Sequence, residues 1–246
     1  AKALQDPPRR WGFVFQGKQY EGLVCAFLEM VWGNGGDLVD GSGRVLIDGP
    51  EAVEALRYLI DAVRKDRISS EAVLTYQEEE ARHAFQEGRA VFMRNWPYAY
   101  NLLNAKGSPV AGKVGISPMV RGRGKRGAAT LGGWGFGISA FSKNPDAAWK
   151  FIRFHAEPAQ QKLAFLMGGI IPTRRALFKD ADVLKAAPHM RDFERVLEGA
   201  RPRPVHPAYA RVSDILQARV SSALSGQEEP AEALKSAADE IRVWLK

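Results

Sequence analysis

The sequence has few of the residues that build disulfides, redox centres or metal sites. Among its 246 residues are one cysteine and four histidines. The single thiol, Cys25, excludes a disulfide within the chain, and its apolar neighbours favour a buried, unreactive side chain. No HExxH, CxxC or GxSxG motif occurs. Glu79, Glu80 and His83 lie at helical spacing, but we interpret them as a solvated helix face. The sequence therefore predicts no metal, no cofactor and no catalytic residue.

Long hydrophobic runs are also missing. No stretch of about 18 consecutive apolar residues appears, which predicts that no segment of this sequence crosses a membrane. Residues 1–8 lack the charged start and apolar stretch of a secretory signal. They read as the end of a helix that runs into Pro7-Pro8, and we interpret the chain as a fragment of a longer protein.

Positive charge is in excess, with 35 Lys and Arg against 28 Asp and Glu and a formal net charge of +7. Most of this surplus is spread along helices, but residues 121–127 form a cluster, RGRGKRG. We interpret this cluster as a mobile loop first and an anion site second. Its glycines match the dinucleotide-binding pattern by letters, but the strand–turn–helix context is missing.

Alternating strand and helix patterns predict an α/β fold. Apolar residues at helical spacing, some preceded by a proline in the first turn, predict the helices, and glycine or proline residues indicate where they end. The predicted helices are 20–32, one beginning at Pro50, 78–87, 145–155, 158–167 and most of 183–246; the predicted strands are 11–16, 90–93 and 113–117, with a hairpin in 37–48 and an extended segment at 130–139.

Aromatic residues follow the strand predicted at 90–93. Trp96, Tyr98 and Tyr100 are close together, and Trp134 follows two glycines that would let a ligand or another backbone approach. Sugars present flat C–H faces that pack on such rings, and Trp and Tyr supply rigid contact area. From spacing alone, however, aromatics at strand ends are more often core residues.

Four segments carry a more specific pattern: YQEEEAR at 76–82, FMRNWPYAY at 92–100, ATLGGW at 129–134, and RPVHPAY at 203–209. Together they resemble the trehalose/maltose-binding type of ABC transporter solute-binding protein, a family 1 extracellular sugar-binding protein. The resemblance runs in order along essentially the whole chain. Compared with such a protein, this sequence has no counterpart for roughly the first third.

The resemblance implies a periplasmic binding protein type II fold, in which two lobes are joined by a hinge and the N-terminal lobe is incomplete in this chain. It assigns residues 1–117 to the C-terminal lobe, 118–173 to the N-terminal lobe and 174–246 again to the C-terminal lobe. We expect residues 118–173 to expose apolar surface, because their packing partners would lie in the absent segment.

The resemblance also implies the sugar site. Trp96 and Tyr98 would stack on the sugar, and Gly133 with Trp134 would approach from the other lobe. Arg203 would donate a forked set of hydrogen bonds to hydroxyls, with a salt bridge near the hinge as its alternative role. The full set of expected ligand-binding residues is Trp96, Tyr98, Gly133, Trp134, Arg203, Tyr20 and Glu21.

The implied function is that of a receptor, not an enzyme. It would bind α-linked disaccharides such as trehalose, maltose or sucrose-like sugars between its lobes and deliver them to an ABC permease from the periplasm or from a membrane anchor outside the cytoplasm. This fragment would bind weakly unless the absent segment were supplied in trans. Alternatives are a receptor for glucose or another sugar, a carbohydrate-active enzyme, or a nucleic-acid binder that uses residues 121–126 with Trp96 and Tyr98; we expect no nucleic-acid partner.

Overall fold

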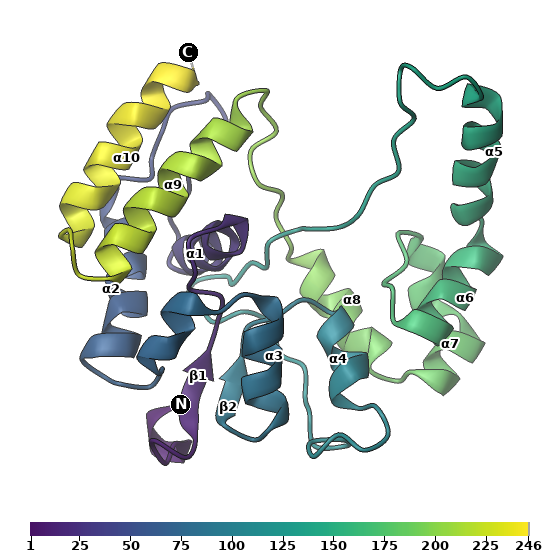
Figure 1. Cartoon of the computed structure of the whole chain (residues 1–246), viewed down its shortest axis with the longest axis horizontal. Helices are drawn as coiled ribbons and strands as arrows, with labels where there is room; N and C mark the ends of the chain where they lie inside the picture. Colours follow the sequence, from purple (N-terminus) through teal and green to yellow (C-terminus); the bar gives the residue numbers. More distant parts are fainter. Residues whose placement is uncertain (246) are drawn as a thin grey trace.

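The computed structural model describes residues 1–245 and shows a helix-rich α/β fold (Figure 1). Short 3₁₀ turns occur at Lys2–Leu4, Glu71–Thr75 and Arg175–Lys179. The strands are β1 (Trp11–Val14) and β2 (Ala90–Met93), and the helices are α1 (Glu21–Gly33), α2 (Pro50–Arg64), α3 (Glu78–Gln86), α4 (Tyr98–Leu103), α5 (Pro145–His155), α6 (Pro158–Gly168), α7 (Ala181–Ala186), α8 (Met190–Glu198), α9 (Tyr209–Leu224) and α10 (Pro230–Trp244).

The two strands pair in parallel, with Trp11 opposite Ala90 and Val14 opposite Met93. Parallel pairing requires a long crossover between the strands, and α1, α2 and α3 provide it. The strands predicted at 11–16 and 90–93 are confirmed, although β1 ends at Val14. Beyond the paired strands, the Gln16 side chain donates to the Arg94 carbonyl, so the chain after β2 lies beside the segment that leads from β1 to α1.

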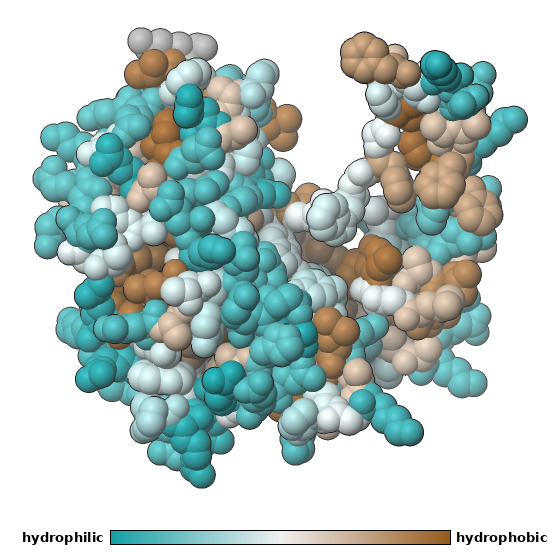
Figure 2. Space-filling view, in the orientation of Figure 1, coloured by the Kyte–Doolittle hydropathy of each residue, from teal (hydrophilic) through white to brown (hydrophobic). Residues whose placement is uncertain are grey.

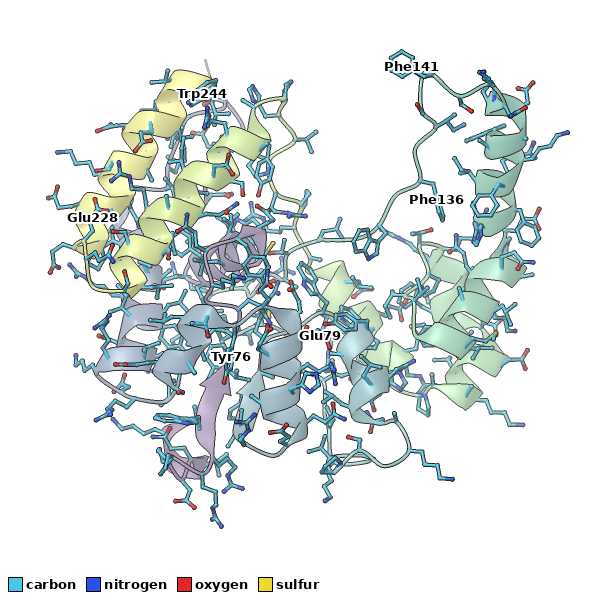
Figure 3. The ribbon with its side chains drawn as sticks, viewed as in Figure 1. Tyr76, Glu79, Phe136, Phe141, Glu228 and Trp244 are labelled. Atoms are coloured by element: carbon cyan, nitrogen blue, oxygen red, sulfur yellow. The ribbon has the colours of Figure 1, made fainter. Side chains whose placement is uncertain are left out.

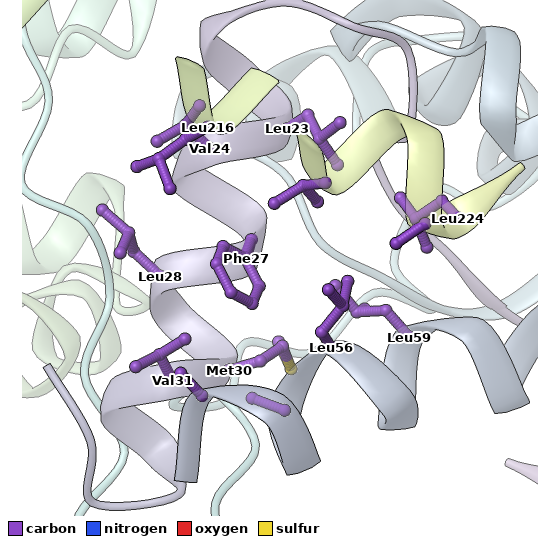
Figure 4. Packing of buried hydrophobic residues seen from close by; sticks show 14 of the residues in the cluster. Leu23, Val24, Phe27, Leu28, Met30, Val31, Leu56, Leu59, Leu216 and Leu224 are labelled. Atoms are coloured by element: carbon purple, nitrogen blue, oxygen red, sulfur yellow. The ribbon is translucent and has the colours of Figure 1, made fainter. Parts of the chain in front are cut away.

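The main core surrounds α1, which is buried at every position from Gly22 to Gly33. A helix that is apolar on all sides belongs in the interior, and α2 and α9 pack against it while α10 covers α9. Figure 4 shows Phe27 of α1 among the leucines of α2 and α9. Pro50 occupies the first turn of α2, as predicted, where its missing N–H costs nothing.

A smaller arm, formed by α5 to α8, stands to one side of this main body in Figure 1. Phe165 of α6, Val183 of α7 and Met190 of α8 form a second buried cluster, against which Tyr100 of α4 packs. The arm is thus joined to the main body through α4. The assignment of residues 1–117, 118–173 and 174–246 to lobes stays a prediction.

Two of the predicted extended segments form less regular structure than expected. Residues 113–117 form no strand and have no bridge partner, and Ile116 packs on the second cluster. Within 130–139, only Thr130 has a bridge partner, Arg201. The predicted hairpin in 37–48 is confirmed as one antiparallel bridge between Val39 and Val45.

The expected exposure of apolar side chains in residues 118–173 is confirmed. No residue of α5 is buried, and Figure 2 shows hydrophobic side chains along the arm. Phe141 is 94% exposed and Trp134 is fully exposed. The other large apolar side chains exposed in this range are Val120, Leu131, Phe136, Ile138, Trp149, Phe151, Phe154, Leu163, Leu166, Met167 and Ile170.

Candidate functional site

The first part of the candidate site is an aromatic patch formed by Trp96 and Tyr98 where β2 leads into α4. The backbone N–H of Trp96 donates to the Asn95 side chain at 2.8 Å, which fixes the turn. The Trp96 indole N–H donates to the Glu78 carboxylate at 3.1 Å, and the Tyr98 hydroxyl donates to Glu79 at 2.6 Å. Both carboxylates belong to the first turn of α3, where acidic residues are favoured by the helix dipole.

At neutral pH, the Tyr98 hydroxyl keeps its proton and the Glu79 carboxylate stays ionised. Burial, and then the hydrogen bond to Glu79, raise the pKa of Tyr98, which stays a neutral donor. The Arg82 guanidinium, and to a smaller degree the Tyr98 hydroxyl, lower the pKa of Glu79, which stays a charged acceptor. The two rings are therefore held at their polar edges and are only partly buried.

The second part is a polar groove of about 600 Å³ beside the start of α9. Glu21, in the first turn of α1, accepts hydrogen bonds from Arg203, from the Tyr209 hydroxyl at 2.7 Å and from Ser213. The salt bridge given above as the alternative role of Arg203 is therefore present, with Glu21 as its partner. Burial, and then Glu21, raise the pKa of Tyr209. The groove is lined by Glu21, Leu131, Pro202, Arg203, Pro204, Tyr209, Ala210, Ser213, Asp214 and Gln217.

Tyr20 is the residue that precedes α1, and its hydroxyl lies near Glu78, the carboxylate that holds Trp96. Its hydroxyl is buried and has no hydrogen-bond partner among residues 1–245. Burial, and then the charge of Glu78, raise the pKa of this phenol. A buried, unpaired hydroxyl costs about 1–3 kcal/mol, so a polar group brought to it would recover free energy.

The glycines before Trp134 lie differently from each other. A Cβ added to Gly132 would lie 2.8 Å from the Trp96 ring, whereas one added to Gly133 would meet nothing within 4 Å. Trp134 is fully exposed. The structure thus brings Gly132 to the aromatic patch and leaves Gly133 and Trp134 in solvent.

A family model described as "Bacterial extracellular solute-binding protein" matches residues 3–162. The chain belongs to this family. The predicted fold class is confirmed as well, because a maltose-bound MalE3 of T. maritima superposes with a TM-score of 0.91 at 47% identity, over 96% of this chain and 61% of that one. A solute-binding protein of Agrobacterium radiobacter K84 in complex with ribitol superposes with a TM-score of 0.86 at 27% identity, over 98% of this chain and 61% of that one.

Among curated relatives, a probable ABC transporter-binding protein of Deinococcus radiodurans is 41% identical over 93% of this chain. This chain spans 55% of that relative's length. The family and these relatives are binding proteins, in agreement with the prediction that the chain is not an enzyme. Among residues 1–245, no group of three or more His, Cys, Asp or Glu could hold a metal ion, and no helix has the length and apolarity to cross a membrane.

In this solute-binding protein, the sequence-based prediction of the site omitted the residues that hold the predicted ones. Glu79 belongs to the helix face interpreted as solvated, and Glu78 is not among the expected site residues, yet Glu78 accepts from Trp96 and Glu79 accepts from Tyr98. Tyr209 and Ser213, which converge on Glu21, were not predicted as site residues. The sequence gives little indication of these contacts, because Tyr209 and Glu21 are more than 180 residues apart and no local motif links them.

Proposed function

We propose that the whole protein to which this chain corresponds is the sugar-binding receptor of an ABC importer. It would bind an α-linked disaccharide such as trehalose, maltose or a sucrose-like sugar and deliver it to the membrane permease. The proposal is supported by the family, by the maltose in the related MalE3 structure and by the aromatic patch beside a polar groove. Receptors of this kind act outside the cytoplasmic membrane, and we place this one in the periplasm or on an external membrane anchor.

The observation that carries the proposal is the way in which Trp96 is held. Its indole N–H is fixed by Glu78 at 3.1 Å, and the Arg94 guanidinium lies 4.3 Å from its ring centroid. A tryptophan whose edge and position are already fixed loses little entropy when a sugar stacks on it. The neighbouring carboxylates of Glu78 and Glu79 can accept hydrogen bonds from sugar hydroxyls.

The proposed roles of the other residues follow their placement. Tyr98 continues the stacking surface, and Tyr20 offers a buried hydroxyl near Glu78. Arg203 and Glu21 present paired donors and acceptors at the groove. Trp134, together with Gly133, would reach the sugar only when the arm closes over the main body.

The exposed apolar surface supports a two-lobed whole. We propose that residues 118–173 form part of a second lobe whose remaining chain covers α5 and α6. The relatives contain chain beyond the matched part, since this chain spans 55% of the D. radiodurans protein and 61% of the T. maritima one. Such a segment, added in trans or by fusion, would restore the missing half of the sugar site.

The test is a tryptophan fluorescence titration with trehalose, maltose, sucrose and glucose. It is performed on this chain alone and on the chain joined to the upstream segment of the T. maritima relative. We expect no saturation below millimolar sugar for the chain alone and micromolar binding for the joined protein, because two or three added charged hydrogen bonds of about 1.5–3 kcal/mol each correspond to several orders of magnitude in Kd.

The matched variants are Trp96→Ala and Trp244→Ala in the joined protein. Trp96→Ala should weaken binding at least tenfold, while Trp244→Ala, at the exposed end of α10, should leave the Kd unchanged (Figure 3). Saturation with glucose but with no disaccharide would favour the alternative of a monosaccharide receptor. Release of glucose from trehalose or maltose during the titration would contradict a receptor that does no chemistry.

A further inference from the structure

Two connections between the main body and the arm lie side by side. The chain leaves the body at Thr130 and returns at Arg201, and these residues form a parallel bridge. The Leu131 N–H donates to the Arg201 carbonyl at 2.8 Å, and the Arg201 N–H donates to the Ala129 carbonyl at 2.8 Å. The two connections therefore form one hydrogen-bonded unit at the base of the arm (Figure 1).

This unit is tied to α1. The Thr130 N–H donates to the Glu29 carboxylate at 2.9 Å, and the Thr130 hydroxyl donates to the Cys25 carbonyl at 3.2 Å. Glu29 is therefore the side chain of the buried helix that reaches the outgoing connection. It is 2% exposed, so this contact lies in the interior, away from competing water.

The same Glu29 carboxylate forms a two-bonded ion pair with Arg94 at the end of β2. The Arg94 Nε and Nη2 atoms donate to its two oxygens at 2.8 Å each, and both side chains are 2% exposed. Gln16 accepts from Arg94 Nη1 and donates to the Arg94 carbonyl, each at 3.1 Å. Burial alone would lower the pKa of Arg94, but the Glu29 charge holds it above its usual value. Both charges are thus compensated inside the core, as a buried pair requires.

Arg94 also supports the proposed stacking residue, since its guanidinium lies 4.3 Å from the Trp96 ring centroid. The Trp96 ring in turn lies against Gly132, two residues after Thr130. One Glu29 oxygen, Oε1, accepts from both Arg94 and the Thr130 N–H. The outgoing connection and the tryptophan are therefore linked in two ways, by direct contact at Gly132 and through the buried Glu29 carboxylate with Arg94.

We propose that Glu29 is a positioning residue that fixes Trp96 and the connection at Thr130 relative to each other through Arg94. This inference rests on the proposed function for the meaning of Trp96 as a sugar platform, but its geometry does not depend on any sugar. Loss of the network should free both ends together: the amides of the connection and the indole of Trp96.

The test uses the 246-residue chain without sugar and measures hydrogen exchange of the Thr130, Leu131 and Arg201 amides. The main variant is Glu29→Leu/Arg94→Met, which removes both charges, because removing one partner alone would leave a buried charge unpaired and could prevent folding. We expect these three amides to exchange at least tenfold faster, while amides within α9 and α10 keep their wild-type rates. Thr130→Val is the matched control: it loses only the hydroxyl bond and keeps the N–H bond to Glu29.

The second readout is acrylamide quenching of Trp96 fluorescence, obtained by subtracting the signal of the corresponding Trp96→Phe variant. In Glu29→Leu/Arg94→Met, the quenching constant of Trp96 should rise at least twofold. Unchanged exchange at Thr130, a change at only one end, or faster exchange spread evenly over α9 and α10 would each overturn the proposal. A chain that shows the linked change but binds no sugar in the titration would instead contradict the proposed function alone.

Discussion

At the scale of single residues, the candidate site depends on contacts that differ between neighbours in the sequence. Gly132 and Gly133 are the sharpest case. A methyl group at Gly132 would press on the Trp96 ring at 2.8 Å, whereas the space beside Gly133 is open. The difference between identical substitutions at these two positions therefore reports on the contact between Gly132 and Trp96.

We predict that Gly132→Ala displaces Trp96 and lowers the free energy of unfolding by about 1–3 kcal/mol, the usual cost of a forced shift in a packed contact. Gly133→Ala should change it by less than about 0.5 kcal/mol. Urea unfolding followed by tryptophan fluorescence measures both. Equal effects of the two substitutions would show that Trp96 does not lie against Gly132.

Glu21 offers a second prediction at this scale. Its carboxylate accepts from Arg203, Tyr209 and Ser213, so Glu21→Ala leaves three donors unpaired. We expect a loss of about 2–3 kcal/mol in the free energy of unfolding, because a buried polar group left without a partner costs more free energy than a hydrogen bond contributes on balance.

The control for Glu21 is Glu228→Ala on the surface. Glu228 pairs with the partly exposed Arg219 at 3.4 Å (Figure 3), and a pair of this kind contributes about 0–1 kcal/mol. Urea midpoints of the two variants should therefore differ clearly. A Glu21→Ala midpoint equal to that of Glu228→Ala would mean that the polar groove is not a stabilising network.

At the scale of elements, the sequence predicted what depends on local chemistry and omitted what depends on distant partners. The helix at Pro50–Arg64 follows from its proline and its apolar stripe. Residues 113–117 have strand-like alternation, but a strand also needs a partner, and Ile116 packs on the second cluster instead. Trp96 could be chosen as a site residue through resemblance, whereas its contacts with Glu78 and Arg94 required the fold.

The second cluster, which joins α4, α6 and α8, contains a titratable group. The His189 ring packs against Tyr100 at a tilt of 36°, with 4.1 Å between ring centroids, and its centroid lies 5.6 Å from that of Phe193. Burial lowers the pKa of His189 below its usual 6.5, and nearby Asp192 opposes this only in part. Its Nε2 atom is buried without a partner among the described residues, so a proton there would be poorly accommodated.

The sign of the pH effect follows. Because the folded pKa is the lower one, the unfolded chain binds the proton first as pH falls below about 6.5. We therefore predict that the melting temperature of the chain decreases between pH 7.5 and 5.5, and that His189→Gln flattens this dependence. His206→Gln, on the exposed segment before α9, should keep the wild-type profile. A wild-type slope in His189→Gln would contradict the assignment.

At the scale of the whole molecule, the main body is complete in its core while the arm is not. α1 is buried at 12 consecutive positions, whereas no residue of α5 is buried. Trp149, Phe151 and Phe154 are each about half exposed. Contiguous apolar surface of this kind promotes association with other surfaces.

We predict that the isolated chain binds the dye ANS and self-associates at micromolar concentration, as measured by light scattering after size exclusion. Replacing Phe136, Phe151 and Phe154 by Ser should reduce both signals several-fold, since these rings lie on the arm. Replacing the exposed Val243 and Trp244 of α10 is the control and should have little effect. If the chain without substitutions stayed monomeric and bound no ANS, the apolar side chains of the arm would have to be covered in solution.

The position of Cys25 in α1 makes the chain convenient for labelling. It is the only thiol in the sequence, it is 1% exposed, and burial raises its pKa to about 11. At pH 7 only about one molecule in 10⁴ would carry the reactive thiolate there. Maleimide dyes should therefore not react with Cys25 in the folded chain and should label only a cysteine introduced at the surface. A pair of such cysteines, one on the arm and one on α10, would let energy transfer follow the swing of the arm without any background from the protein itself.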